Sequence, residues 1–587
     1  MSEPLSAPQL AGLAGGRGDA DTFAVLRGGQ LGRRRLLTVA AARAAADQPL
    51  VGQSLALLTR AERADPAAVA DVLAHPPVTG WARAMLDGTT GPAYLAALAA
   101  VAATRAGLTY TLTLPGPVDG VLPLPTVGTA TGLPAGPVLL RGEADTLRID
   151  AEGAAGAGLR IGSVAGGGVR IGGAAGGGRV GTDGGGVSWW PLRRISLVEG
   201  FVVTVDDQDP WRRCYHRPSA DRLDDAAAAR LSRLTADGWQ WLLAHLPAHA
   251  DALTVLLRSL VPLLPPPSGN AVSATSRDAL GAIALSVPAD AQTLALLLVH
   301  ELQHTKLGAL LDLVPLYRPG GAARYRAPWR LDPRPVGALL QGAYAHLGVA
   351  EVWRCRQHEG ITAAFEYAYW REQTSRAARQ LAGAAELTAA GRSFVAGMTR
   401  ALRDWRDPVD GRVEAVVRDV ADAGAVRWGL ANLTPDPEGV DRLARAWRQG
   451  VAPDAGMPTP TVAPAPASPA LRADSGPEAA VRRQLLDASG PPVSNPSDQA
   501  YAAGKLEDAL AGYRRRLTAD PGDVDAWVGL ALTARHTGQP AAAGALAGRP
   551  ELVRALDQTL PDADPLALAE WLGQAVPAAE RHPEPGR

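Results

Sequence analysis

The sequence is poor in cysteine, has no long apolar run and carries almost no net charge. Its two cysteines, Cys214 and Cys355, exclude a disulfide framework and are typical of thiols in a reducing compartment, so we expect a cytoplasmic protein. Because no run of about 18 uninterrupted apolar residues is present, we expect no transmembrane helix. The 58 Lys and Arg residues balance 59 Asp and Glu residues, and the net charge of -1 favours neither nucleic acid nor an anionic membrane as a partner.

One basic stretch resembles an export signal at first sight. Residues 32–41, Gly-Arg-Arg-Arg-Leu-Leu-Thr-Val-Ala-Ala, are similar to a twin-arginine signal, but they lie far from Met1 and Arg43 interrupts the apolar run. We interpret the stretch as part of an ordinary amphipathic helix.

At 587 residues, the chain is long enough for roughly three or four structural units. Its patterns predict an α+β, helix-rich protein with five segments. The segments are an N-terminal helical region (1–108), a β-rich region with a Gly-rich insert (109–205), a mainly helical domain with a candidate metal site beside a small sheet (206–450), a Pro- and Ala-rich linker (451–476) and a helical region similar to tetratricopeptide repeats (477–587).

The β-rich segment is predicted to form hairpins. Residues 109–114 alternate with period two, and three short Arg-Ile strands follow at 147–150, 159–162 and 169–172. Triple glycines follow the last two strands. They lack the strand–glycine–helix context and the following Lys-Ser/Thr of a phosphate-binding loop, so we interpret them as low-complexity turns.

An acidic turn follows two further predicted strands, 189–195 and 201–205. Residues 206–212, Asp-Asp-Gln-Asp-Pro-Trp-Arg, offer oxygen ligands to a cation, but they lack the glycine and distal glutamate of a calcium loop. We favour a capped turn. Residues 220–262 are predicted to be helical, and short strands are expected at 271–275 and 282–287.

The most informative stretch is His300-Glu301-Leu302-Gln303-His304, an H-E-x-x-H motif inside an apolar run. Leucines at helical spacing, with Asp290 as N-cap, predict a helix from about 291 to 313. On a helix His300 and His304 are i and i+4, so they project from one face within reach of one metal ion. The strand before such a helix commonly lines a cleft, and its free edge can hold an extended peptide.

The third metal ligand is less obvious than the first two. Leu307 and Leu310 occupy the places where the extended metzincin pattern needs glycine and histidine, so that class is excluded. The third ligand is then either a glutamate from a later helix or a further histidine. The candidates are Glu351, Glu359, Glu366, His358 and His346, of which we favour His346 because a histidine inside an apolar helix needs a partner.

Beyond the motif the chain is predicted to be mainly helical. Residues 325–335 form a proline-rich loop with several anion-binding groups. Helices are expected at 336–356, 363–387, 390–406 and 408–431. In the C-terminal segment Gly504 and Gly538 lie one tetratricopeptide period apart, which indicates either a helical hairpin that packs on the main body or a docking module for a protein partner.

Four stretches together resemble one family. They are Asp206–Pro210, Leu298–His304, Pro328–Pro335 and Gly342–His346, and they are similar to the HExxH-motif peptide-modification proteins, which include the 2-oxoglutarate-dependent HExxH-type peptide β-hydroxylases found beside radical SAM peptide maturases. The resemblance covers roughly residues 20–450.

The resemblance implies an enzyme that uses Fe(II), 2-oxoglutarate and O2 to hydroxylate a β-carbon in a ribosomally made precursor peptide. It implies His300, His304 and His346 as metal ligands and a radical SAM maturase as a partner. Arg330 and Arg334 fall in the segment that we assign to the carboxylate of 2-oxoglutarate, since an arginine fork suits a bidentate carboxylate. The alternative for either arginine is a surface or helix-capping salt bridge.

The residues alone leave two questions open. Three histidines are at least as typical of zinc as of iron, so the choice of iron depends on the resemblance. Glu301 would be the catalytic general base of a zinc metallopeptidase, but an oxygenase needs no such base, and Glu301 would then support or bind the metal. The two enzymes, and a non-catalytic interaction protein that binds partners through its C-terminal helices, are the three functions that we consider.

Overall fold

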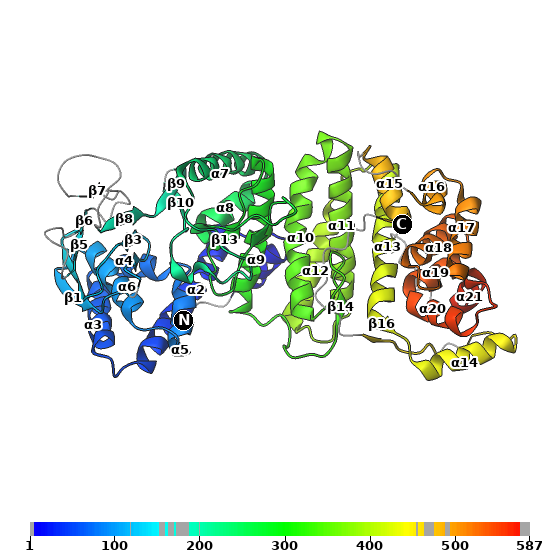
Figure 1. Cartoon of the computed structure of the whole chain (residues 1–587), viewed down its shortest axis with the longest axis horizontal. Coiled ribbons are helices and arrows are strands. Elements are labelled where there is room, and N and C mark those ends of the chain that lie inside the picture. Colours follow the sequence, from blue (N-terminus) through cyan, green and yellow to red (C-terminus); the bar gives the residue numbers. More distant parts are fainter. Residues whose placement is uncertain are drawn as a thin grey trace. The chain divides into compact units, whose positions relative to one another are not determined.

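The computed structural model describes residues 5–575 except 118, 152–158, 163–169, 172–186, 199, 454–455, 463–474 and 488–493. The chain divides into two compact units, one of residues 1–13 and 17–315 and one of residues 14–16 and 316–587. The predicted α+β, helix-rich class is confirmed, because the structure is 58% helical with 12% strand (Figure 1). The unit boundary falls inside the segment 206–450, directly after the helix that carries the H-E-x-x-H motif.

The helices up to residue 315 are α1 (Ala7–Ala14), α2 (Ala20–Ala44), α3 (Pro49–Ala64), α4 (Pro66–Leu73), α5 (Val78–Leu86), α6 (Ala93–Arg105), α7 (Asp225–His245), α8 (Pro247–Leu256) and α9 (Ala291–Leu311), with the short 3-10 helix η1 (Pro210–Arg212). The helical prediction for the first segment is confirmed, apart from residues 1–4, which lie outside the described part. Helix α6 is apolar all round, as a fully buried helix must be. It packs on α3, α4 and the first sheet.

The strands up to residue 315 are β1 (Tyr110–Leu114), β2 (Leu122–Leu124), β3 (Gly128–Thr131), β4 (Val138–Glu143), β5 (Thr146–Ala151), β6 (Leu159–Gly162), β7 (Arg170–Ile171), β8 (Ser188–Pro191), β9 (Arg193–Val198), β10 (Phe201–Val205), β11 (Ser259–Pro262), β12 (Ser273–Ala274) and β13 (Ala282–Leu285). They form an antiparallel sheet β1-β4-β5-β6-β7, a small sheet β2-β3-β8 and a mixed sheet β12-β13-β11-β10-β9. The predicted hairpins are confirmed in the first sheet, while both glycine triplets lie outside the described residues.

The mixed sheet differs from the sequence prediction in two places. Residues 259–262, predicted as the end of a helical stretch, form the central strand β11, which pairs in parallel with β10 and β13. All four residues of β11 are buried, and so short an apolar run carries no period that separates strand from helix. The single strand predicted at 189–195 is two strands, because the chain leaves the small sheet at Pro191 and joins the mixed sheet at Arg193.

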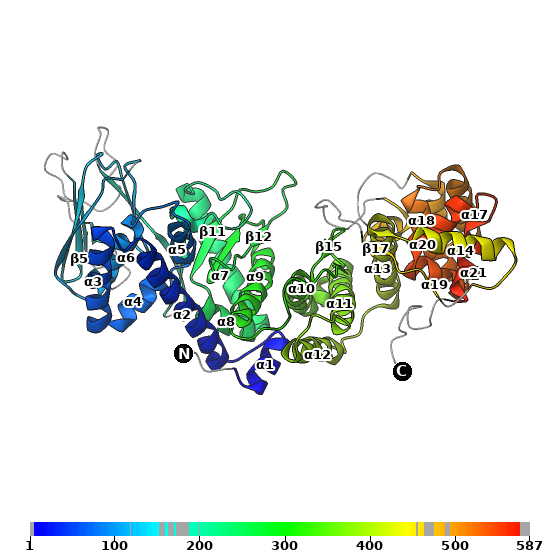
Figure 2. The ribbon, with the colours of Figure 1, turned by 90° about the horizontal axis from the view of Figure 1, so that it is seen from below.

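The mixed sheet places the motif helix. Strands β9 and β10, which precede residue 206, belong to the same sheet as β11 to β13, so this sheet spans the boundary at 205 drawn from the sequence. Helices α7, α8 and α9 pack together, and α9 also contacts β12 and β13 (Figures 1 and 2). Strand β12 is at one end of the strand order, next to the motif helix.

The helices after residue 315 are α10 (Val336–Arg356), α11 (Ile361–Ala382), α12 (Ala389–Asp404), α13 (Gly411–Asn432), α14 (Pro437–Arg448), α15 (Pro477–Leu485), α16 (Pro496–Ala502), α17 (Leu506–Ala519), α18 (Val524–His536), α19 (Pro540–Gly548), α20 (Pro550–Thr559) and α21 (Pro565–Gly573), with the 3-10 helix η2 (Gln357–Glu359). Two small antiparallel sheets pair β14 (Tyr325–Arg326) with β15 (Pro333–Arg334) and β16 (Leu433–Thr434) with β17 (Thr461–Val462). The four helices predicted between 336 and 431 are confirmed to within a few residues.

Helices α15, α18, α19 and α20 pack against α13, and the remaining C-terminal helices pack on their neighbours. Gly504 and Gly538 each end the first helix of a pair, α16–α17 and α18–α19, and both have positive φ, 72° and 74°. This left-handed conformation favours glycine, which explains why glycine recurs at this spacing. Docking of a partner on these helices stays a prediction. Among the residues that the structure describes, no helix is long and apolar enough to cross a membrane.

The close approach of α7 to α9 can be tested at Gly238. A Cβ atom there would lie 3.0 Å from the carbonyl oxygen of Ala291, so a branched side chain must push the two helices apart. We expect Gly238→Val to lower the free energy of unfolding by about 1–3 kcal/mol in denaturant titrations. The control is Gly52→Val in α3, where a Cβ meets nothing within 4 Å. Equal effects of the two substitutions would contradict the packing argument.

Candidate metal centre

The motif helix α9 begins as the sequence predicts. The carboxylate of Asp290 caps it by accepting a hydrogen bond of 2.8 Å from the backbone N–H of Thr293. Most of its residues are buried, but one stripe at four-residue spacing is only half-buried, and this stripe consists of Gln292, Leu296, His300 and His304. The two motif histidines therefore lie on the one side of the helix that is open to a ligand.

His300 and His304 lie side by side on this stripe. Their ring centroids are 4.9 Å apart and the rings are nearly perpendicular, at 78°. Burial lowers the pKa of His300 to about 4, the charge of Glu301 opposes this shift, and His304 adds to it. At neutral pH His300 is therefore uncharged, which is the form that binds a metal ion. Two adjacent imidazoles, of which His300 is neutral, fit the first two ligand positions of a metal site.

Glu301 is buried, with 2% of its surface exposed. Its Oε1 accepts a hydrogen bond of 2.7 Å from the hydroxyl of Ser273, and its Oε2 accepts one of 2.9 Å from the hydroxyl of Thr275. The same Oε1 lies 3.9 Å from Nε2 of His300. Ser273 and Thr275 are two residues apart at strand β12, so both side chains point to the face that α9 covers. The motif glutamate thus ties the helix to the edge strand.

Ser273 and Thr275 are not among the site residues that the sequence predicts. The available signal was two hydroxyl residues at strand spacing just before an H-E-x-x-H helix. Because a buried carboxylate needs donors, this signal could have predicted the pairing, although it could not have distinguished these hydroxyls from others nearby in the sequence.

His346, the predicted third ligand, lies in the second unit, on α10. Its ring is stacked between Trp329, at 4.2 Å between centroids, and Trp370, at 4.5 Å. Its Nδ1 is 2.7 Å from the carbonyl oxygen of Gly342, so in the tautomer that donates this bond the lone pair is on Nε2. A Cβ atom at residue 342 would lie 2.3 Å from Trp329, which explains the glycine at this position.

Arg330 and Arg334 share one carboxylate. Nε of Arg330 donates to Oδ1 of Asp332 at 2.6 Å, and Nη1 of Arg334 donates to Oδ2 at 3.0 Å. Burial alone would raise the pKa of Asp332, but the two arginines outweigh it and lower that pKa. Both guanidinium groups are therefore in a salt bridge, as our alternative interpretation has it. Binding of 2-oxoglutarate by the same arginines stays a prediction.

The candidate residues fall into two groups. His300, Glu301 and His304 belong to the first unit, whereas His346, Arg330 and Arg334 belong to the second, as do the alternative ligands Glu351, His358, Glu359 and Glu366. Within the described residues no group of three or more His, Cys, Asp or Glu side chains is arranged to hold a metal ion. The three-histidine site stays a prediction.

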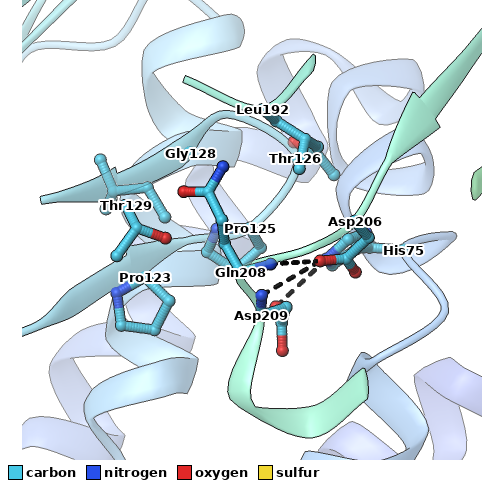
Figure 3. A pocket seen from close by; sticks show the side chains of 11 residues that line it. His75, Pro123, Pro125, Thr126, Gly128, Thr129, Leu192, Asp206, Gln208 and Asp209 are labelled. Atoms are coloured by element: carbon cyan, nitrogen blue, oxygen red, sulfur yellow. Dashed lines mark hydrogen bonds and ion pairs between the residues drawn. The ribbon is translucent and has the colours of Figure 1, made fainter. Parts of the chain in front are cut away.

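The acidic turn forms a second buried cluster in the first unit (Figure 3). Asp209 caps η1 through the N–H of Trp211, which agrees with the capped turn that we favoured. The other carboxylate oxygen of Asp209 accepts a hydrogen bond of 2.7 Å from Tyr94 and lies 3.2 Å from Nε2 of His75. Asp206 is fully buried, and its Oδ1 accepts from the N–H of Asp209 at 3.0 Å.

Asp206 and its neighbours line a cavity of about 10 Å³, roughly the space of one water molecule. Oδ2 of Asp206 has no hydrogen-bond partner among the described residues. Burial and the nearby charge of Asp209 raise the pKa of Asp206 to about 6. His75 and Tyr94 come from helical segments more than 100 residues earlier, and nothing in the local sequence predicted their place in this cluster.

Neither a scan against protein-family models nor a search of curated proteins finds a match to this chain.

The tie between Glu301 and the edge strand can be tested by removing its donors. We expect Ser273→Ala and Thr275→Val each to lower the free energy of unfolding by about 1.5–3 kcal/mol, because each leaves a buried carboxylate oxygen without its hydrogen bond. Thr254→Val is the control, since the hydroxyl of Thr254 bonds to the exposed carbonyl of Asp251. Denaturant unfolding of the metal-free protein measures the effect, and losses no larger than the control would contradict it.

The buried Asp206 predicts a pH dependence of stability. Its pKa is about 6 in the folded protein and near its ordinary value of 3.8 in the unfolded chain. Between these values the folded state holds a proton that the unfolded state has lost, so this residue's contribution to stability is present at pH 4 and is lost as the pH rises through 6.

We therefore expect Asp206→Asn to remove part of this decline, worth about 1–3 kcal/mol between pH 4 and 7. Asp237→Asn is the control, because Asp237 is an exposed residue on α7. Free energies of unfolding across this pH range measure the effect. An unchanged slope in Asp206→Asn would contradict the assignment.

Proposed function

We propose that the protein is a peptide β-hydroxylase that depends on Fe(II) and 2-oxoglutarate and acts on a ribosomally synthesised precursor peptide. The proposal combines the family resemblance with three features of the first unit. These features are the two adjacent motif histidines, the edge strand beside them and the hydrogen bonds of Glu301. When bound, iron with 2-oxoglutarate and O2 supplies the oxidising power to place a hydroxyl group on a β-carbon.

The contacts of Glu301 are the observation that carries the proposal. A general base must take a proton from metal-bound water, so its carboxylate has to be directed at that water. Both oxygens of Glu301 accept a hydrogen bond from a hydroxyl at the edge strand, which holds the carboxylate toward β12. This arrangement favours a structural role for Glu301, which is compatible with an oxygenase because that enzyme needs no general base.

The chain's own residues would then divide the work. His300 and His304 would ligate the metal, and Glu301 would hold the orientation of the helix that carries them. His346 is proposed as the third ligand, and Arg330 and Arg334 as the site for the carboxylate of 2-oxoglutarate. The carboxylate of 2-oxoglutarate would then have to compete with Asp332 for these two arginines.

A zinc metallopeptidase is the second candidate. It is favoured by the place of Glu301, whose Oε1 lies 3.9 Å from His300, and by the edge strand β12 beside the motif helix. In that enzyme Glu301 would be the general base. We further propose that the C-terminal helices recruit a protein partner, such as a radical SAM maturase, in the cytoplasm.

The two enzymes can be separated by one set of reactions. We expect the protein, Fe(II), 2-oxoglutarate and a candidate precursor peptide to yield a peptide heavier by one oxygen atom, together with succinate, both measured by mass spectrometry. His300→Ala and His304→Ala should abolish the product. His245→Ala, an exposed histidine on α7, is the control and should leave it unchanged.

Glu301→Gln gives opposite results for the two candidates. A hydroxylase should keep its activity within about tenfold, because glutamine retains the size and one acceptor of the side chain. A peptidase should lose at least about 100-fold, because its base is gone. Zinc-dependent cleavage without 2-oxoglutarate would overturn the proposal. A purified protein that contains no transition metal, and that binds none when the metal is added, would favour a non-catalytic protein.

A further inference from the structure

A second cavity of the first unit lies directly beside the candidate centre. Its volume is about 460 Å³, within the usual range of ligand sites. It is lined by Arg33, Arg83, Cys214, His216, Thr275, Ser276, Arg277 and Asp278. Thr275 links it to the motif helix, because the same residue donates its hydroxyl to Glu301. Neither the proposed chemistry nor the family resemblance uses this cavity.

Three arginines from different parts of the unit meet at the cavity. Arg33 comes from α2, Arg83 from α5 and Arg277 from the loop after β12. They share a smaller number of carboxylates. Asp278 accepts a hydrogen bond of 2.6 Å from Arg83 and lies 3.9 Å from Arg33, while Asp312 pairs with Arg277 and Arg33.

The lining is therefore cationic overall. Its three arginines face one aspartate, and with Asp312 included the positive charge still exceeds the negative by one. About half of each side chain of Arg83 and Arg277 is exposed, so solvent-borne anions can reach them. A guanidinium group presents several N–H donors in one plane, and among the described residues the hydrogen bonds and ion pairs of these arginines engage only some of them.

Strand β12 connects the cavity to the motif. It is the end strand of the mixed sheet and pairs only with β13 among the described strands. An end strand can accept an extended peptide as an added strand. Residues 275–278 directly follow β12. An extended chain rises about 3.3 Å per residue, so the four-residue step from Ser273 to Arg277 spans at most about 13 Å.

We propose that the arginine cavity binds acidic side chains of the peptide substrate, which lies as an added strand along β12. The peptide residue that is modified lies beside His300 and Glu301. An acidic residue roughly two to four positions away from it along the peptide enters the cavity and pairs with Arg83 and Arg277. This inference rests on the proposed function for its peptide substrate. It adds a sequence preference, an acidic residue at one side of the modified position.

The peptide is favoured over a small free anion by the form of the site. Arg277 follows the last residue of β12 by three positions, and the cavity is larger than a carboxylate or dicarboxylate needs. Backbone pairing along β12 adds affinity that a free dicarboxylate lacks.

Binding to the full-length, metal-free protein tests the proposal. The probes are a fluorescein-labelled octapeptide of alternating Ala and Glu and its counterpart with Gln in place of Glu, followed by fluorescence anisotropy. We expect the Glu peptide to bind at least about tenfold more tightly than the Gln peptide, the effect of about one charge-assisted pair. Arg83→Gln and Arg277→Gln should each remove most of that difference.

The control variant is Arg60→Gln, an exposed arginine on α3 outside the cavity. Thermal unfolding of each variant checks that it is folded, and Arg33→Gln replaces any variant that is not. Equal affinity for the two peptides, or equal effects of the cavity and control variants, would overturn the proposal. Competition by free glutarate at the affinity of the Glu peptide would also overturn it, in favour of a small-dicarboxylate site.

The outcome is separable from that of the proposed function, since binding is measured without iron or 2-oxoglutarate. A protein that binds the Glu peptide through Arg83 and Arg277 but never adds oxygen keeps this inference and loses the hydroxylase. A protein that hydroxylates peptides regardless of these arginines keeps the hydroxylase and loses this inference.

Discussion

The first unit depends on one buried carboxylate. Glu301 lies between α9 and β12, and a carboxylate in such a place is costly unless donors satisfy it. The hydroxyls of Ser273 and Thr275 do so with one hydrogen bond to each oxygen. Because residues 300 and 301 are separated by about 100° on a helix, fixing Glu301 toward the strand also fixes where His300 and His304 point. The open stripe of α9 is thus a consequence of how its buried side is held.

Much of this arrangement follows from local sequence. Asp290 and the leucine spacing predict α9, and the H-E-x-x-H spacing places both histidines on one face. The central strand β11 could not be predicted, because its four buried residues carry no alternation. The sequence also contains the carboxylate that pairs with Arg330 and Arg334, close to both arginines. Asp332 lies two residues from each, and the bend at residues 331–332 brings its carboxylate to both arginines.

Two side-chain clusters depend on contacts between residues far apart in the sequence, so they could not be predicted from local patterns. The turn at Asp206–Asp209 was predicted as a capped turn, but its burial comes from His75 and Tyr94, which lie more than 100 residues earlier. The arginine cavity has the same origin, since α2, α5 and the loop after β12 each give it one arginine. No single stretch of the chain carries a sign of either cluster. Both arise from the packing of the N-terminal helices against the segments around the mixed sheet.

The glutamate of an H-E-x-x-H motif therefore has to be judged by its hydrogen bonds. A base needs a lone pair directed at the proton that it takes, whereas an anchor needs donors that hold its carboxylate in place. Glu301 has donors on both oxygens, and they come from the strand that a peptide would join. A peptide added along β12 would lie beside the strand that holds Glu301. Through this contact, the proposed peptide binding and the orientation of the two histidines would share one structural element.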